Sequence, residues 1–342
     1  MMIGALELRA GRMAVVAEPS ANHVGSYDRA VRLVQSAKGS GADAIKFQPY
    51  QPEDHTRNHP HPAYRLPADK WGGGTLWDLY TKAQTPYSWL PGLIEVAEDL
   101  GLPWFASVVS ARGLDVLEGL SCPGYKVPSA EVADCRFVEL VASVGKPVII
   151  SDGMATPSQM AAAMSVVPFD RCVILKCVSE YPAPASAYNL ATIRALRDGD
   201  IPCGVSDHTT GITIPVMAAT LGSVMLEKHL MADDWLTEWP LDCGHSLDPE
   251  GFAAMVRAVR EAEAAMGSVV LGASHEAGKG WRRRLVAARD LPAGHTLDSE
   301  DVTTARCGEG MEPDERSVGR TLTVAVSEGE PLTQGSFTVR AA

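Results

Sequence analysis

Four short polar segments of this chain follow apolar runs, and their residue types are those that do chemistry in enzymes. Carboxylates, imidazoles, ammonium groups and hydroxyls can bind a metal ion or a phosphate and can move protons. The carboxyl ends of parallel strands meet at one rim of a barrel, so side chains that end such runs are expected to share a site. The sequence therefore predicts an enzyme. The four segments are residues 18–23, 125–131, 206–209 and 227–229.

A divalent metal ion is predicted beside His208 and His229, which end two successive apolar runs. Their imidazoles would be neighbours around a barrel rim, and two histidines leave positions for water and substrate oxygens. Such an open site suits Mn²⁺ or Mg²⁺ as a Lewis acid better than a closed structural zinc. Each histidine taken singly could instead be a hydrogen-bonded structural residue.

The other histidines receive different interpretations. His23 and His245 are candidates for proton transfer. His55, His59 and His61 cluster in an irregular insertion, where a solvated loop is favoured over a second metal site.

A phosphate-binding set is predicted from two lysines and three serines that also end apolar runs. The ammonium groups act as point charges, and the hydroxyls fix orientation. Either lysine could instead form a Schiff base, as in class I aldolases. The histidine metal pair argues against this, because it already supplies electrophilic activation. The set is Lys46, Lys126, Ser129, Ser151 and Ser206.

Glu18 and Glu131 are expected to face the same mouth of the barrel. A carboxylate beside a metal ion and a bound substrate can accept hydrogen bonds from hydroxyls or move a proton. The alternative for each is an ion pair with Lys46 or Lys126.

Eight apolar runs alternate with stretches of helical periodicity, which is typical of a (β/α)8 barrel. A Rossmann sheet is disfavoured, because no G-x-G-x-x-G motif opens a helix after the first run. The expected strands are residues 14–17, 44–47, 104–108, 124–127, 148–150, 173–178, 203–205 and 224–226.

The insertion at residues 51–84 is the longest segment without clear periodicity and contains the phrase Trp71-Gly72-Gly73-Gly74. Long loops at the catalytic face of a barrel usually cover the substrate, so a lid is expected here. The alternative is a surface loop that has no role in function.

Three parts are predicted along the chain. Residues 1–266 form the barrel, residues 267–281 a glycine-containing linker, and residues 282–342 a small β-rich second domain. Short β-like runs broken by turns mark the last part, and they are too few to bury a large core.

The composition of the chain argues against nucleic acid and membranes as its binding partners. The 342 residues are 46% hydrophobic and carry a formal net charge of −12, which disfavours nucleic acid and anionic lipid. The sequence lacks a run of 18 apolar residues and a signal-like start, so a cytoplasmic location is expected, with no membrane partner. Seven cysteines without a C-x-x-C pair indicate neither a disulfide framework nor a zinc ribbon.

The polar motifs, taken in order, resemble those of the nonulosonic (sialic) acid synthases. The tail from Arg282 is similar to the small antifreeze-like (SAF) domain of these enzymes and includes Arg306 in a matching phrase. Within the family, residues 74–80, 85–89 and 175–184 look more like pseudaminic acid synthases than N-acetylneuraminate synthases. The motifs that carry the likeness are residues 17–23, 41–48, 125–131, 145–155, 177–182, 206–211 and 227–229.

The resemblance implies condensation of phosphoenolpyruvate with the open-chain aldehyde of an acetamido or diacetamido hexose, with release of phosphate. It assigns Mn²⁺ or Mg²⁺ to His208 and His229. It assigns the sugar to Glu18, Glu131, Asp242 and Arg306, with Asn22 and His23 also in the substrate-binding set. Glu18, Glu131, His208 and His229 would be catalytic. Phosphoenolpyruvate would be held by Lys46, Lys126, Ser129, Ser151, Ser179 and Ser206.

The resemblance also implies a homodimer in which each tail caps the barrel of its partner and supplies Arg306. The linker is long enough to cross a subunit boundary. The alternative is that Arg306 pairs with a nearby carboxylate such as Glu309.

Three other functions stay open. One is a catalytically degenerate homologue that binds sugar or phosphate without turnover. Another is an N-acetylneuraminate or legionaminic acid synthase of the same family. The third is a class II aldolase acting on free pyruvate, which would release no phosphate.

Several positions depart from the family pattern. Val24 stands where a polar residue is usual, Val108 and Asp152 each replace a threonine, and residues 230–234 read Leu-Met-Ala-Asp-Asp instead of Phe-Thr-Leu-Asp-Arg. Loss of a hydroxyl and gain of a carboxylate near a phosphate are expected to weaken its binding unless the carboxylate points away.

Overall fold

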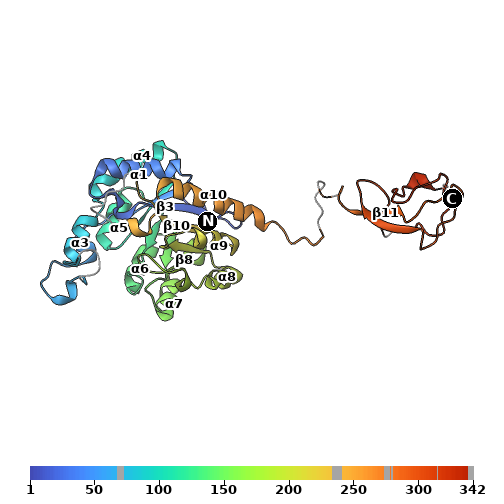
Figure 1. Cartoon of the computed structure of the whole chain (residues 1–342). Coiled ribbons are helices and arrows are strands. Elements are labelled where there is room, and N and C mark those ends of the chain that lie inside the picture. The colour runs from blue at the N-terminus through green and yellow to red at the C-terminus, as the bar shows by residue number, and fades with distance from the viewer. Residues whose placement is uncertain (68–72, 233–240, 273–277, 279, 314, 338–342) are drawn as a thin grey trace. The chain divides into compact units, whose positions relative to one another are not determined.

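Eight parallel strands close into a barrel, as the alternating pattern predicted (Figure 1). The structure is a computed structural model and describes residues 1–67, 73–232, 241–272, 278, 280–313 and 315–337. Each expected run overlaps one strand, and the first strand and the last two continue into the polar segments that follow them. The strands are β3 (Ala14–Glu18), β4 (Ala44–Phe47), β5 (Trp104–Ser107), β6 (Tyr125–Val127), β7 (Val148–Ser151), β8 (Cys172–Cys177), β9 (Cys203–Asp207) and β10 (Met225–His229).

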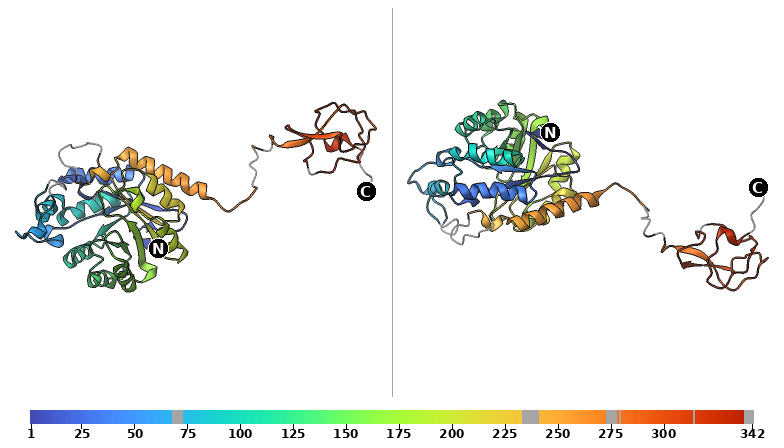
Figure 2. Two further views of the ribbon diagram at one scale, coloured as in Figure 1. Left: turned by 60° about the horizontal axis from the view of Figure 1, so that its bottom comes forward. Right: turned by 90° about the horizontal axis from the view of Figure 1, so that it is seen from above.

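Helices cover the outside of the barrel (Figure 2). Their starts follow local capping: Ser26 accepts a hydrogen bond from the Arg29 amide at α1, and Asp248 does so from Gly251 at α10. The helices are α1 (Tyr27–Gly39), α2 (Pro52–His55), α3 (Leu76–Ala83), α4 (Leu90–Asp99), α5 (Ala111–Gly119), α6 (Cys135–Ser143), α7 (Pro157–Val166), α8 (Ala191–Asp198), α9 (Thr213–Thr220) and α10 (Pro249–Met266). Short 3-10 turns occupy Ser20–His23, Pro62–Tyr64, Tyr87–Trp89, Phe169–Arg171, Ala185–Ala187, Cys243–His245 and Gln334–Ser336. None of the described helices combines the length and apolar character needed to cross a bilayer.

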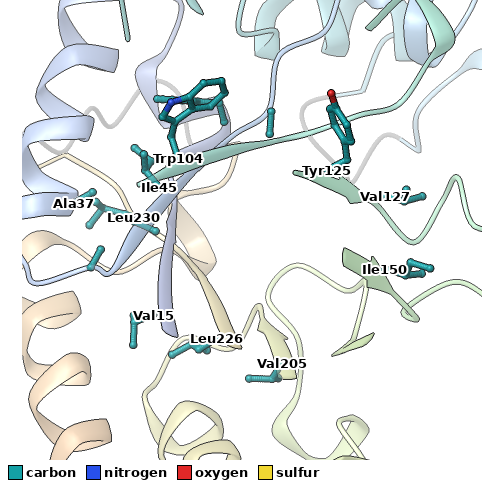
Figure 3. Packing of buried hydrophobic residues seen from close by; sticks show 14 of the residues in the cluster. Val15, Ala37, Ile45, Trp104, Tyr125, Val127, Ile150, Val205, Leu226 and Leu230 are labelled. Atoms are coloured by element: carbon teal, nitrogen blue, oxygen red, sulfur yellow. The ribbon is translucent and has the colours of Figure 1, made fainter. Parts of the chain in front are cut away.

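The strands alternate between two cores, because successive side chains point to opposite faces. The outward residues pack under the helices, and Figure 3 shows Val15, Ile45, Val205 and Leu226 in this layer. The inward residues at the amino end of the barrel form a second apolar cluster, which includes Ala14. An antiparallel hairpin, β1 (Met2–Ile3) and β2 (Leu6–Glu7), packs against that inner cluster through Ile3, Leu6 and Leu8. The amino end of the barrel interior is therefore dry.

The insertion after β4 is more ordered than its sequence indicated. It contains α2 and α3, and α3 begins with a capping box between Thr75 and Asp78. Thr75 also bridges to Arg65, which closes part of the insertion on itself. Trp71 and Gly72 of the glycine-rich phrase lie outside the described residues.

The chain divides into two compact units, Met1–Gly267 and Ser268–Ala342. In the second unit β11 (Arg283–Ala287) pairs antiparallel with β12 (Val302–Arg306) over a small apolar core that includes Leu285 and Phe337. The fully buried Asp301 accepts hydrogen bonds from the Arg289 guanidinium, and its other oxygen lies 2.7 Å from His295 Nε2. A buried charge with these partners holds loops together where the core is small.

Candidate active site at the carboxyl end of the barrel

The inward-facing positions become polar at the carboxyl end of the same strands. There they line a cavity of about 280 Å³, close to the lower end of the ~300–1,000 Å³ typical of small-molecule sites. Every barrel strand contributes at least one inward side chain to this lining. These side chains are Glu18, Lys46, Ser107, Lys126, Ser151, Cys177, Ser206, Glu227 and His229.

Two lysines and two glutamates form a charged network in this lining. Lys46 pairs with Glu18 and donates to Ser107 Oγ over 2.7 Å. Lys126 Nζ lies 3.1 and 3.2 Å from the two carboxylate oxygens of Glu227, and Lys46 Nζ lies 3.6 Å from that carboxylate. The network carries both signs, and its ammonium groups face the cavity.

Burial and pairing act in opposite directions on these carboxyl groups. Burial raises the pKa of Glu18, and the Lys46 ammonium offsets only part of that rise. Burial alone would raise the pKa of Glu227 too, but Lys126 and Lys46 outweigh it and lower the pKa to about 2. Glu227 is therefore a permanent anion between two cations, whereas Glu18 accepts a proton more readily.

Four serine hydroxyls stand beside this network. Ser206 Oγ donates to Glu227 over 3.0 Å, and the Ser129 and Ser179 hydroxyls lie 2.9 Å apart. Ser151 Oγ is buried against the cavity and has no hydrogen-bond partner among the described residues. An unpaired buried hydroxyl is costly, so it marks a place where a bound oxygen atom fits.

Two participants of the network, Ser107 and Glu227, were absent from the predicted set. Glu227 stands two residues before His229 on the same strand, and Ser107 stands two residues after the inward Phe105. Both residues could have been found only from the alternation of inward and outward side chains along a strand, which places residues two apart on the same face.

The alternate residues of these strands point outward, and some of them stabilise the loops at the carboxyl end of the barrel. Lys228 Nζ donates to Asp207 Oδ2 over 2.7 Å, and both side chains are completely buried. The same ammonium donates to the carbonyl oxygens of Thr209 and Gly211. This outer pair fixes the loop that follows His208.

Three histidines meet beside the charged network. The ring of His208 lies 5.3 Å from that of His229, and the ring of His245 lies 4.5 Å from His229. His208 Nδ1 is 2.7 Å from the carbonyl oxygen of Val178. A carbonyl only accepts, so Nδ1 carries the proton and Nε2 keeps its lone pair.

The histidine cluster suits a divalent cation. One nitrogen each of His229 and His245, with a carboxylate oxygen of Asp242, all lie within 4.8 Å of one another. Burial lowers the pKa of His208 to about 4 and that of His229 well below its ordinary value, which keeps both rings neutral. Neutral imidazoles in a buried pocket are the form that binds a metal. His229, His245 and Asp242 therefore fit a divalent cation, whereas His208 adjoins this group through its ring contact with His229 and is not one of its three members.

Asp242 lies at the edge of this cluster and lines the cavity. One carboxylate oxygen accepts the Ala21 amide over 3.0 Å, and the other lies 3.7 Å from His245 Nε2. Burial raises the pKa of Asp242. The carboxylate is positioned to face either a cation or a hydroxyl group.

The insertion supplies an aromatic wall to the cavity. Tyr50, His55 and Tyr80 line it, and the rings of His55 and Tyr80 stack at 4.5 Å with an interplanar angle of 13°. The expectation of a solvated loop is thus wrong for His55, whose side chain is only 12% exposed, although His59 and His61 are exposed. The covering helix α3 could not be read from periodicity because it is only eight residues long.

Glu131 faces the aromatic wall. Its Oε1 atom lies 3.7 Å from His55 Nδ1, and its buried Oε2 atom has no hydrogen-bond partner in the described part of the chain. Burial raises the pKa of Glu131 to about 7. The group is thus able to give or take a proton near neutral pH.

Asn22 and His23 lie beside the cavity lining rather than in it. The Asn22 amide donates to the Leu230 carbonyl and to Ser246 Oγ, over 3.0 and 2.8 Å. His23 Nδ1 accepts the Gly25 amide, so its Nε2 donates to Thr85 Oγ1 over 3.0 Å. Both residues connect loops around the site.

Two further predicted residues are also outside the lining. Ser179 reaches the site through its contact with Ser129. Arg306 lies on β12 of the second unit with an exposed side chain, and no ion pair joins it to Glu309 among the described residues.

The departures from the family pattern take up different positions. The Asp152 carboxylate accepts from Lys176 Nζ and the Cys177 amide, over 2.8 and 2.7 Å, so these partners hold it outside the cavity lining. Val108 is buried in the outer apolar layer. Val24 has a φ of 52°, a conformation that a polar asparagine adopts more easily than valine. Residues 233 and 234 of the altered segment lie outside the described residues.

Comparison with known proteins gives a consistent result over most of the chain. The model of the NeuB family matches residues 33–270, and that of the SAF domain matches residues 282–338. Pseudaminic acid synthase from Campylobacter jejuni is 34% identical over 94% of this chain and 96% of its own length. Pseudaminic acid synthase from Helicobacter pylori is 35% identical over 87% of this chain and 89% of its own length.

Other relatives and solved structures extend this result. N,N'-diacetyllegionaminic acid synthase from Legionella pneumophila is 31% identical over 93% of this chain and 92% of its own length. The solved N-acetylneuraminic acid synthetase from Leptospira borgpetersenii superposes with a TM-score of 0.70 at 25% identity, over 81% of this chain and 93% of that chain. The chain therefore belongs to the NeuB family and carries a SAF domain in its second unit.

Proposed function

We propose that this chain joins phosphoenolpyruvate to the open-chain aldehyde of an acetamido or diacetamido hexose. The product is a 3-deoxy-2-keto nonulosonic acid of the pseudaminic type. Pseudaminic acid synthases at 34–35% identity over most of the chain support this choice. The single observation that carries it is one cavity in which two lysines, five serines and two histidines of the cluster, His208 and His229, meet.

The reaction forms one carbon–carbon bond and one carbon–oxygen bond and breaks another carbon–oxygen bond. The methylene carbon of phosphoenolpyruvate attacks the aldehyde, water adds to the former enol carbon, and phosphate leaves with the bridging oxygen. Lys46 and Lys126 balance the charge of the phosphate and carboxylate groups, while Ser129, Ser151 and Ser206 hold their oxygens.

The acidic side chains deal with protons and with the sugar. Glu18 and Glu131 accept or donate protons as the aldehyde oxygen becomes a hydroxyl and as water adds. Asp242 accepts a hydrogen bond from a sugar hydroxyl. His208 and His229 would hold Mn²⁺ or Mg²⁺, which when bound supplies a Lewis acid for the aldehyde oxygen.

In this proposal Asn22 and His23 act on the substrate indirectly, through the loops that they hydrogen-bond. They hold the loops around Glu18 and Ser246, so they position substrate contacts without touching the substrate. Their loss is expected to reduce turnover less than loss of a cavity-lining residue.

We also propose a homodimer, located in the cytoplasm, in which Arg306 of one subunit contacts the sugar in the barrel of the other. Complementation tests this arrangement. Glu18→Ala and Arg306→Ala proteins, each inactive alone, are expected to regain activity after subunit exchange, because one site of each mixed dimer is intact. No recovery, with heterodimers verified by native mass spectrometry, would contradict a shared site.

Phosphate release from phosphoenolpyruvate, measured with a panel of acetamido and diacetamido hexoses, tests the proposed reaction. Sugar-dependent release with formation of a keto acid is the expected result. If none of the sugars leads to phosphate release, a degenerate homologue is favoured. Consumption of free pyruvate without phosphate release would favour an aldolase. The preferred sugar also separates pseudaminic from legionaminic and N-acetylneuraminate synthesis.

A further inference from the structure

His245 comes to the histidine cluster from a different part of the fold than the two predicted metal ligands. It ends a 3-10 turn after β10, whereas His229 ends β10 and His208 follows β9. Its ring lies 4.5 Å from His229 and 5.6 Å from His208. Three imidazoles thus meet, and two of them, His208 and His229, line the cavity.

The free nitrogens of this cluster point to a missing partner. Nδ1 of His229 and Nε2 of His245 are both buried and have no hydrogen-bond partner among the described residues. Their side chains are 7% and 1% exposed, so solvent satisfies neither atom well. Buried polar atoms without a partner are rare, and each needs an explanation.

The spacing of the donors fits a single ion. Donor atoms about 2.0–2.2 Å from a cation lie roughly 3–4 Å from each other. Asp242 Oδ1 is 3.7 Å from His245 Nε2, and one nitrogen of His229 lies within 4.8 Å of both donors. The distance between Asp242 Oδ1 and His245 Nε2 already falls within this range.

We propose that His245 is a third imidazole ligand of the active-site cation, beside His208 and His229, with Asp242 as a carboxylate donor. The proposal rests on the proposed function only for the identity of the site's occupant. Imidazole favours transition ions, whereas Mg²⁺ prefers oxygen donors and keeps several waters. The site therefore selects Mn²⁺ over Mg²⁺.

A merely structural His245 would show the same ring contacts. Edge-to-face packing of histidine rings contributes through shape alone, and a phenylalanine could replace it. The His245→Phe variant keeps the ring and deletes both nitrogens. It therefore separates coordination from packing.

Metal affinity of the full chain, freed of metal and studied without substrates, tests the proposal. The dissociation constant for Mn²⁺ is measured from the free-ion electron paramagnetic resonance signal, and that for Mg²⁺ by competition. His245→Phe is expected to weaken Mn²⁺ binding at least about tenfold and to reduce the preference for Mn²⁺ over Mg²⁺. His61→Phe, which changes an exposed histidine, is the matched control and leaves both constants unchanged.

A Mn²⁺ affinity within twofold of the wild type in a folded His245→Phe protein would overturn the proposal. If that variant does not fold, pulsed resonance on the Mn²⁺-loaded wild type counts the coordinated imidazoles directly. Three support the proposal and two overturn it. Because no substrate is present, the result stands whether or not phosphate release is found.

Discussion

Two buried lysine–carboxylate pairs each use one residue of β10, one pair inside the barrel and one outside. The inner pair joins Lys126 to Glu227 at 3.1 Å, and the outer pair joins Lys228 to Asp207 at 2.7 Å. All four side chains are nearly or fully inaccessible to solvent. Glu227 and Lys228 are adjacent in sequence, so a single step along β10 separates the two environments.

The pairs differ in what else their groups can bind. The outer ammonium is saturated by Asp207 and the carbonyls of Thr209 and Gly211. The inner ammonium faces a cavity whose walls include the Ser151 hydroxyl, for which the described residues offer no hydrogen-bond partner. Burial and charge pairing alone therefore do not identify a functional residue. Unused hydrogen-bonding capacity beside a cavity is the better sign.

Replacement of the outer lysine, Lys228→Met, is expected to have the largest effect on stability. It leaves the buried Asp207 carboxylate and two carbonyl oxygens without their ammonium partner. Breaking a buried pair in this way destabilises a protein by about 3–5 kcal/mol. Urea unfolding followed by circular dichroism measures the change.

The double variant Asp207→Asn with Lys228→Met is the matched control for this first prediction. It removes both charges, so much of the lost stability is expected to return. A loss below about 1 kcal/mol in Lys228→Met would show that the outer pair does not stabilise the fold.

Period-two alternation explains how much of this site could be predicted from the sequence. Glu18, Lys46 and Ser206 end runs whose inward phase is fixed by the apolar residues before them. The eight-strand barrel and its rim follow from the same alternation. Where alternation was not applied, as for Ser107, a cavity-lining residue was missed.

Residues beyond the strand ends could not be placed in this way. Asn22 and His23 follow Ser20, whose φ of 42° turns the chain away from the strand direction, so their facing cannot be counted from Glu18. His55 reaches the cavity only because the insertion folds back over the barrel mouth. These positions depend on tertiary packing, which no local pattern encodes.

Replacement of the inner lysine, Lys126→Met, is expected to act on ligand affinity more than on stability. In this variant Glu227 keeps Lys46 at 3.6 Å and Ser206 at 3.0 Å. The buried carboxylate therefore loses less of its stabilisation than Asp207 does in Lys228→Met. Loss of one charged hydrogen bond weakens phosphoenolpyruvate binding by about 1.5–3 kcal/mol, or roughly 10- to 150-fold. Calorimetry with phosphoenolpyruvate measures the dissociation constant.

Lys176→Met provides the matched control for this second prediction. Lys176 is also a barrel-strand lysine, but it pairs with Asp152 at 2.8 Å outside the cavity lining. Its replacement should leave the affinity for phosphoenolpyruvate unchanged. Equal affinities for Lys126→Met and the wild type would remove Lys126 from the phosphate site.

Glu131 provides the smallest and most specific prediction, because it is a cavity carboxyl that forms no ion pair with a lysine in the described part of the chain. Burial raises its pKa from about 4.5 to about 7, so the folded protein holds the proton between these values while the unfolded chain releases it. The stability that this group contributes is therefore present below pH ~4.5 and is lost as the pH rises through ~7. The protonated form of Glu131, which can donate a hydrogen bond to a sugar oxygen, is likewise present at low pH and is lost as the pH rises through ~7.

If protonated Glu131 assists the sugar, kcat/KM for the sugar should fall about tenfold as the pH rises from 6 to 8. Glu131→Gln keeps a hydrogen-bond donor at every pH, so its profile should be flatter over that interval, whereas Glu53→Gln, at an exposed carboxyl, should retain the wild-type fall. Ionisation of phosphoenolpyruvate itself would persist in all three proteins, so only the difference between them reports on Glu131. Identical profiles for Glu131→Gln and the wild type would show that Glu131, like the outer pair, is buried without taking part in the chemistry.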